Sequence, residues 1–270
     1  RIPGTLHHID ANEPNEYEKA LGAIVGILAN YDYDQKFAVM GFGAKYDGTV
    51  RHCFQCGPDK EAHGIGGVID AYERVFKTKL TMSGPTVFSE VIYTSADRAT
   101  HAQADAKLRG QQAYSILLIV TDGSVTDLEH TKRSIASVSD APLSIIIVGV
   151  GAADFTAMQE IDDMELGRDI VQFVPMNEFS SSREALTAAT LDEVPTQLVQ
   201  YFMSNGILPM KQVALDEDNI VRDPYQKDTE INLQFYTGAD GAAAIGGGTG
   251  YYDDSFAKFK KKTVSSPRRS

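Results

Sequence analysis

The chain has 270 residues and a formal net charge of −12, which allows one large domain or two small ones. A hydrophobic fraction of 43% excludes wholesale disorder, and no apolar run approaches the roughly 18 residues of a transmembrane helix. The acidic balance argues against a nucleic-acid binder, and two cysteines exclude a disulfide scaffold and favour a reducing compartment.

Apolar periodicity predicts alternating helices and strands along the chain. The expected order is helix 15–31, strand 36–42, helices 66–77 and 88–108, strand 115–121, helix 127–139, strand 143–150, helix 155–161, strand 169–174 and helix 191–203. The runs Ser115–Thr121 and Leu143–Val150 are continuously aliphatic, which is typical of strands buried on both faces of a parallel sheet. Thr126 or Asp127 is expected to cap the helix over 127–139. The alternation predicts an α/β fold with a mostly parallel central sheet flanked by helices.

The composition changes near Pro209. Residues 211–235 are acidic and polar, residues 241–250 are rich in glycine and alanine, and the last stretch is basic. We therefore predict a folded domain over 1–209 and a mostly disordered tail over 210–270. The tail's basic residues offer contacts to anionic lipid or a partner, or form a localisation signal or a solvated end; they are Lys258, Lys260, Lys261, Lys262, Arg268 and Arg269.

Two loops carry oxygen donors that are expected to converge. Asp122 directly follows the buried strand 115–121, at the sheet edge where α/β folds bind ligands. Thr86 precedes the helix that begins near Phe88. Mg²⁺ and Ca²⁺ prefer carboxylate and hydroxyl oxygens. The alternative is structural, with Asp122 as a turn or helix-cap residue and Thr86 as the N-cap of its helix.

Several segments, in this order, closely resemble the von Willebrand factor A-like domain of the copine family. They are Gly41–Lys45, Gly84–Thr86, Leu117–Gly123, Thr131–Lys132, Pro142–Gly151, Ala153–Phe155, Arg168–Pro175 and Glu193–Leu198, with Leu6–His8 and Asn15–Tyr17 at the entry to the first helix. The resemblance covers about residues 5–209. It implies a Rossmann-like sheet wrapped by helices, and a metal-ion-dependent adhesion site that takes Thr86 and Asp122 from this chain.

The resemblance also implies a function in recognition rather than catalysis. Copines bind calcium and anionic phospholipid through two C2 domains that precede this module, and the A-like module is thought to recruit partner proteins. We therefore expect a Mg²⁺ or Ca²⁺ ion, a partner's acidic side chain as a further ligand, and a cytoplasmic protein with peripheral membrane association. The alternative is the substrate-recruiting part of a RING-type ubiquitin ligase, whose RING cysteines this chain lacks.

The chain departs from the family pattern at its start. A family member opens this domain with a central strand that ends in Asp-x-Ser/Thr-x-Ser/Asn, whereas Arg1–His8 begins after that point. We expect the domain to be incomplete at its N-terminus and its metal site to bind weakly. A less favoured alternative is that Glu230–Tyr236 fills the vacant sheet position from the far end of the chain.

Other candidate motifs favour ordinary structural roles. Cys53 and Cys56, with His52 and His63 nearby, match no zinc spacing, so we interpret them as incidental thiols. The cluster Asp162, Asp163 and Glu165 is expected in a solvated loop rather than at a calcium site. The sequence contains no P-loop, Gly-x-Ser-x-Gly or His-Glu-x-x-His motif.

Overall fold

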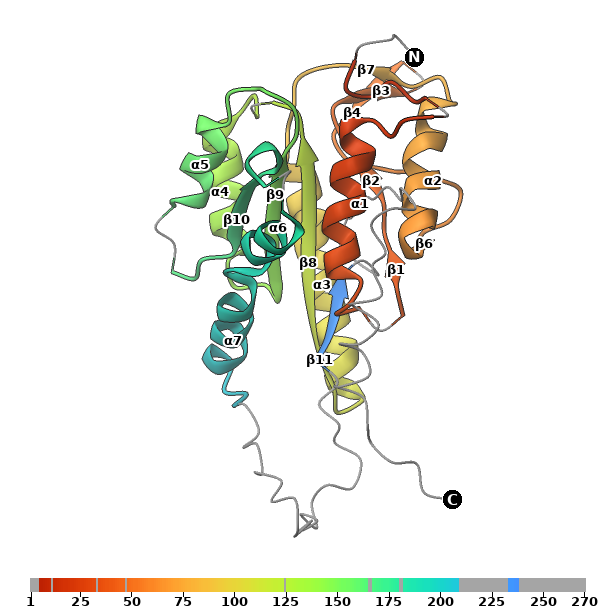
Figure 1. Cartoon of the computed structure of the whole chain (residues 1–270). Coiled ribbons are helices and arrows are strands. Elements are labelled where there is room, and N and C mark those ends of the chain that lie inside the picture. The colour runs from red at the N-terminus through yellow and green to blue at the C-terminus, as the bar shows by residue number, and fades with distance from the viewer. Residues whose placement is uncertain are drawn as a thin grey trace, which may run out of the picture.

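The largest sheet contains four parallel strands in the order β10-β9-β8-β11 (Figure 1). They are β8 (Gln112–Thr121), β9 (Leu143–Gly149), β10 (Val171–Pro175) and β11 (Leu233–Thr237). The computed structural model describes residues 5–10, 12–32, 34–46, 48–123, 125–164, 167–179, 182–208 and 233–237, and for Tyr46 and 233–237 it describes the backbone alone. With the helices on this sheet, the fold is mixed α/β, as predicted.

Small antiparallel sheets accompany the parallel one. The described pairs are β1 (Lys36–Phe37) with β6 (Ala62–His63), β2 (Met40–Gly41) with β5 (Phe54–Gln55), and β3 (Ala44–Tyr46) with both β4 (Thr49–Arg51) and β7 (Thr81–Met82). The prediction of one strand over 36–42 is therefore wrong. This segment divides into β1 and β2 because each half pairs with a different two-residue partner.

The strand β11 comes from the far end of the chain. Leu233 pairs with Gln112 and Thr237 with Ile116, so β11 adds parallel to the first half of β8. β11 overlaps the segment Glu230–Tyr236 of the less favoured alternative, but it pairs with β8 only from Gln112 to Ile116. The physical reason is the open edge of β8, whose backbone N–H and C=O groups need partners. The rest of the predicted tail over 210–270 lies outside the described residues.

Helices cover both faces of the parallel sheet (Figure 1). They are α1 (Glu16–Leu28), α2 (Gly64–Phe76), α3 (Ser89–Leu108), α4 (Leu128–Val138), α5 (Thr156–Asp162), the 3₁₀ turn η1 (Met176–Glu178), α6 (Arg183–Leu191) and α7 (Val194–Ser204). The predicted helices are confirmed, with ends that differ by at most three residues, but α6 was not predicted. Ser182 accepts from the N–H of Ala185 at 3.2 Å, and this N-cap is the signal in the sequence that marks α6. Within the described ranges, none of the helices has the length and hydropathy to cross a membrane.

Two hydrophobic cores lie on opposite faces of the sheet. Ile116, Leu118 and Val120 of β8 pack into one core with α1 and α2. Leu117 and Ile119 pack into the other, with α3, α4 and α5. Because successive residues of a strand point to opposite faces, the continuous apolar run of β8 supplies both cores at once.

The helix caps explain where several helices begin. Asn15 accepts from Glu18 N at 2.9 Å while Glu18 accepts from Asn15 N at 2.6 Å, which forms a capping box at α1. Asp127 caps α4, as predicted, by accepting from His130 N at 2.9 Å. The alternative role of Thr86 as an N-cap is wrong, because α3 begins at Ser89 and Phe88 occupies its N-cap position.

A buried arginine ties α7 to the amino end of the sheet. Arg168 is 9% exposed, and its guanidinium lies 5.5 Å from the ring centroid of Tyr201 on α7. Its hydrogen bonds go to the Ser139 carbonyl (2.8 Å), the Tyr114 hydroxyl (3.0 Å) and the carbonyls of Gln197 (3.1 Å), Leu143 (3.2 Å) and Ala141. A buried guanidinium is tolerated only when its donors are satisfied, so this network holds β8, β9 and α7 in one arrangement.

Carboxyl groups meet where α5, β10 and α7 join. Burial, and then the neighbouring Asp169 carboxyl, raise the pKa of Glu193 to about 7. Asp162 accepts from Phe173 N at 2.8 Å, and burial raises its pKa to about 6. The prediction of a solvated loop is therefore wrong for Asp162, which is half-buried at the end of α5, whereas Asp163 is exposed and Glu165 lies outside the described residues.

Replacing Arg168 should destabilise the chain strongly. Arg168→Met keeps most of the side-chain volume but removes every hydrogen bond that the guanidinium donates to these carbonyls and to Tyr114. Hydrogen bonds to charged groups contribute about 1.5–3 kcal/mol each, so we expect the free energy of unfolding to fall by about 3 kcal/mol or more in urea denaturation. The matched control is Arg74→Met, which removes an exposed ion pair with Asp70 and should change stability by about 0.5 kcal/mol or less. Equal effects of the two substitutions would contradict the stabilising role of the Arg168 network.

The carboxyl cluster should make stability depend on pH. The pKa of Glu193 is raised from 4.5 when unfolded to about 7 when folded, so the folded state holds the proton more tightly. This contribution is fully present below pH 4.5 and is lost as the pH rises to 7. We expect Glu193→Gln to flatten the slope of unfolding free energy in this window, and the exposed Glu129→Gln to leave it unchanged. A slope that is the same in wild type and Glu193→Gln would refute the assignment.

Candidate functional site

The carboxyl end of β8 presents one carboxylate at the surface. Thr121 ends the strand at 3% exposure, and Asp122 directly after it is exposed. The Thr121 hydroxyl donates to the Gly123 carbonyl at 3.1 Å, so the chain turns immediately after Asp122. A buried strand therefore places Asp122 at the edge of the sheet where open α/β folds bind ligands.

The loop that carries Thr86 is hydrogen-bonded to the loop that carries Asp122. The N–H of Thr86 donates to the Thr126 hydroxyl at 2.9 Å, and the Thr86 carbonyl accepts from Thr126 N at 2.9 Å. Thr86 is half-buried, and Thr126 follows Asp122 by four residues. These reciprocal bonds fix one loop against the other.

The donor set suits a hard cation. Asp122 offers carboxylate oxygens and Thr86 a hydroxyl, which are groups that Mg²⁺ and Ca²⁺ accept as ligands. Within the part of the chain that the structure describes, no three His, Cys, Asp or Glu side chains gather at a spacing that would hold a metal ion. Any ion at this edge would therefore need ligands beyond Thr86 and Asp122, and their role as ligands stays a prediction.

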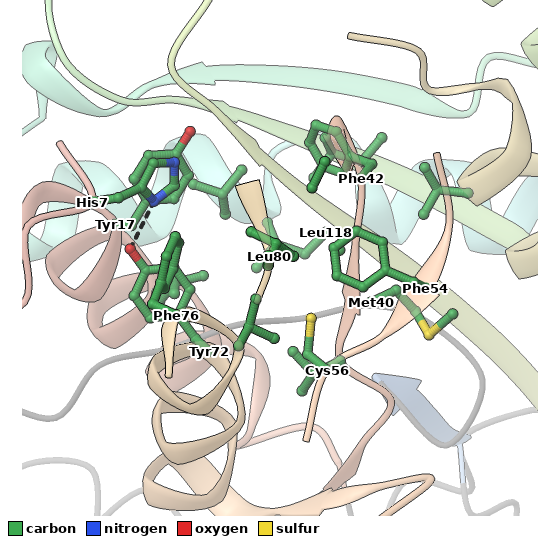
Figure 2. A pocket seen from close by; sticks show the side chains of 18 of the residues that line it. His7, Tyr17, Met40, Phe42, Phe54, Cys56, Tyr72, Phe76, Leu80 and Leu118 are labelled. Atoms are coloured by element: carbon green, nitrogen blue, oxygen red, sulfur yellow. Dashed lines mark hydrogen bonds between the residues drawn. The ribbon is translucent and has the colours of Figure 1, made fainter. Parts of the chain in front are cut away.

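An aromatic cluster next to Asp122 was not predicted from the sequence. The ring of His7 stacks on Tyr17 with centroids 4.0 Å apart, and its Nδ1 lies 2.9 Å from the Tyr72 hydroxyl. Asn15 donates to the same hydroxyl at 3.3 Å. The ring centroids of Phe76 and His7 lie 5.1 Å apart (Figure 2). The sequence places one tyrosine on the apolar face of each helix, Tyr17 on α1 and Tyr72 on α2. Only the fold brings these two helices next to His7.

Asp122 acts electrostatically on this cluster. Burial raises the pKa of Tyr17, and the nearby Asp122 charge raises it further. Burial lowers the pKa of His7, while Asp122 opposes that shift. The two phenols and the imidazole are therefore all uncharged at neutral pH, so they form a neutral wall beside the carboxylate.

His7, Tyr17, Tyr72 and Phe76 also line one side of an apolar cavity of about 130 Å³ that reaches β8 and β2 (Figure 2). Its lining includes Leu118 and Val120 of β8 together with Met40, Phe54 and Cys56. Gly41 makes part of this wall possible, because a Cβ there would lie 2.4 Å from the Phe54 ring. The cavity carries almost no charge and does not resemble the oxygen-rich edge at Asp122.

Comparison with known proteins gives the chain its family. A family model described as Copine matches residues 5–210, a segment that includes Thr86 and Asp122. Copine-E of Dictyostelium discoideum is 41% identical over 217 residues, which are 76% of this chain and 37% of that protein. The chain belongs to the copine family.

Other copine relatives show the same pattern of coverage. Copine-B of Dictyostelium discoideum is 38% identical over 218 residues, 76% of this chain and 40% of that protein. Protein BONZAI 2 of Arabidopsis thaliana is 37% identical over 225 residues, 77% of this chain and 38% of that protein. The chain thus spans well under half the length of these relatives, and β11 lies outside the family match.

The cysteine pair of this copine chain shows no feature of a reactive site. Both thiols are free, and Cys56 is buried whereas Cys53 is half-buried. Burial raises the pKa of Cys56 to about 12 and also raises that of Cys53. The thiolate is the reactive and metal-binding form, so both residues are poor nucleophiles at neutral pH. The basic residues Lys258, Lys260, Lys261, Lys262, Arg268 and Arg269 lie outside the described residues, and their contacts stay predictions.

Thiol labelling should separate the two cysteines. We expect Cys53 to react first with a disulfide reagent at pH 8 and Cys56 to react at least about tenfold more slowly, because its thiol is both buried and protonated. Cys53→Ser should leave only the slow phase, and unfolding in guanidinium should make both fast. Equal rates in the native chain would contradict the burial of Cys56.

Proposed function

We propose that this chain is a protein-recognition module of a copine-like protein, with a von Willebrand factor A-like, Rossmann-like arrangement. In this proposal Thr86 and Asp122 hold Mg²⁺ or Ca²⁺, and an acidic side chain of a partner protein supplies a further ligand. The bound ion would supply a positive charge that recognises the partner's carboxylate. The chain itself performs no covalent chemistry in this scheme.

The observation that carries this proposal is the exposed carboxylate at the end of β8. Asp122 is accessible to a partner, whereas the strand that precedes it is buried along its length. The bonds between Thr86 and Thr126 hold the second donor loop against the same turn. A site with rigid loops and few ligands from one chain suits recognition completed by a second protein.

Uncharged aromatic side chains surround the single carboxylate of Asp122. His7 and Tyr72 are half-buried beside it, and the buried Tyr17 stacks on His7. Aromatic side chains are enriched at protein interfaces because they combine apolar area with a polar end. The partner surface is therefore expected to present one carboxylate among apolar groups. In the longer copine-like protein, calcium-dependent phospholipid binding and peripheral membrane association in the cytoplasm complete the proposal.

Metal titration of the isolated chain tests the proposed ligands without a known partner. We expect weak binding of Mg²⁺ or Ca²⁺ by calorimetry, weakened at least about tenfold, or about 1.4 kcal/mol, by Asp122→Asn and by Thr86→Val. Both substitutions keep the side-chain shape, so thermal stability in chelator should stay unchanged. The matched control Asp97→Asn changes an exposed carboxylate on α3 and should leave the titration as in wild type. Identical titrations for wild type and both site variants would refute the proposal.

A further inference from the structure

The helix α7 is followed directly by the only Asn-Gly pair of the sequence, Asn205–Gly206. Both residues are exposed. Asparagine before glycine is especially prone to deamidation, because glycine has no side chain to hinder its backbone nitrogen when that nitrogen attacks the asparagine amide. The fold decides how readily this reaction occurs, through the way in which it holds the two residues.

The pair lies in a helix cap that is closed by backbone hydrogen bonds. Gly206 N donates to Met203 O at 3.0 Å, and Ile207 N donates to Phe202 O at 2.8 Å. These two bonds have the pattern of a Schellman motif. Gly206 has a φ of +73°, a left-handed conformation that glycine adopts at little cost. The end of α7 is therefore well defined although it is exposed.

This cap keeps the reacting atoms apart. Asn205 has a ψ of 11°, so the Gly206 nitrogen does not eclipse the Asn205 Cβ as a five-membered succinimide ring requires. That nitrogen directs its N–H to Met203 O, and the Asn205 Nδ2 donates to Tyr201 O at 2.9 Å. Asn205 can therefore react only after the last turn of α7 has opened.

The apolar contact of Ile207 opposes this opening. Ile207 is half-buried and packs against a small cluster at the amino end of the sheet. The cluster contains Tyr114, Leu198, Tyr201 and Phe202. A hydrophobic contact of this kind often accompanies the Schellman motif. The next residue, Leu208, is 69% exposed and adds no comparable burial, so Ile207 is the side chain that holds the cap on the cluster.

We propose that Asn205–Gly206 is a deamidation site whose reaction is controlled by the opening of the last turn of α7. In the open turn, the Gly206 nitrogen loses its proton and bonds to Asn205 Cγ. The Cγ–Nδ2 bond breaks, and ammonia leaves with that proton. Water then opens the succinimide at either of its two carbonyls and gives aspartate or isoaspartate. The reaction consumes one water and needs no oxidant or reductant.

The modified chain cannot rebuild the same cap. Isoaspartate adds one carbon to the main chain before Gly206, which displaces the N–H groups of Gly206 and Ile207 from their acceptors. Both products also place a carboxylate at the carboxyl end of a helix, where the helix dipole disfavours negative charge. Deamidation is therefore expected to release Ile207 from its cluster, at the end of the sheet opposite Asp122.

Peptide mapping by mass spectrometry tests the proposal on the full chain at mildly alkaline pH. Asn30 is the matched control, because its Nδ2 also donates to the carbonyl four residues earlier, Gly26 O at 2.8 Å, but tyrosine follows it. We expect Asn205 to deamidate at least about tenfold faster than Asn30. A blocked peptide that copies residues 200–208 should deamidate at least about tenfold faster than the chain, because the chain must first open.

Two substitutions test the control by the cap. Ile207→Ala should speed deamidation of Asn205 at least about threefold, because it removes part of the apolar contact. Val199→Ala changes an exposed apolar residue of the same helix and should leave the rate unchanged. In the deamidated chain, the amide of Ile207 should exchange with solvent faster than in the fresh chain.

The contrary results are distinct. Equal rates in the wild-type chain and the free peptide would show that the cap does not protect Asn205, and this comparison stands even if Ile207→Ala fails to fold. A rate for Asn205 no higher than that of Asn30 would show that Asn205 is not a deamidation site. Unchanged exchange of Ile207 after deamidation would refute the release from the cluster. None of these measurements involves Mg²⁺ or Ca²⁺, so they leave the proposal for Thr86 and Asp122 untouched.

Discussion

The burial of β8 on both faces is the constraint on which the rest of the structure depends. A strand of ten residues that is buried at nearly every position, with the apolar run Ile116–Val120, cannot leave either side to water, so helices must cover both. Leu118 therefore packs under α1 and Ile119 under α3, and two separate cores meet at one strand. The same burial makes its backbone edges costly to leave open. It explains why β11, from a distant part of the chain, pairs with β8.

The two ends of the sheet differ in how they treat charge: the amino end buries a guanidinium, and the carboxyl end exposes a carboxylate. At the amino end, Arg168 is enclosed by carbonyls and by Tyr114, and this network leaves α7 one way to pack. At the carboxyl end, the chain leaves the core at Asp122 and the polar groups face solvent. A firmly held amino end gives the loops at the other end a fixed base, since the loops that carry Thr86 and Asp122 extend from elements that cannot shift independently. The proposed recognition site lies at the carboxyl end of β8.

Local patterns predicted much of the fold because they report local physics. The aliphatic runs of β8 and β9 indicated buried parallel strands, and Asp127 indicated the start of α4. Predictions failed where strand pairing, hydrogen bonding or burial depended on distant residues. The segment 36–42 divides because its two halves pair with different partners, and the backbone groups of Thr86 bond to Thr126 rather than its side chain capping α3. Asp162 was expected in solvent, but it bonds to the backbone of β10 eleven residues away.

The sequence by itself determined the class of fold, the position of Asp122 directly after a buried strand, and the resemblance that the copine match confirms. Each of these depends on neighbours within a few residues, where side-chain periodicity and chain order are sufficient. Only the tertiary structure decided that His7, Tyr17 and Tyr72 stand beside Asp122, that β11 joins β8, and that a cavity follows where β11 ends. These features bring together segments that are fifty or more positions apart, and their free energy comes from packing and hydrogen bonding that no local pattern encodes.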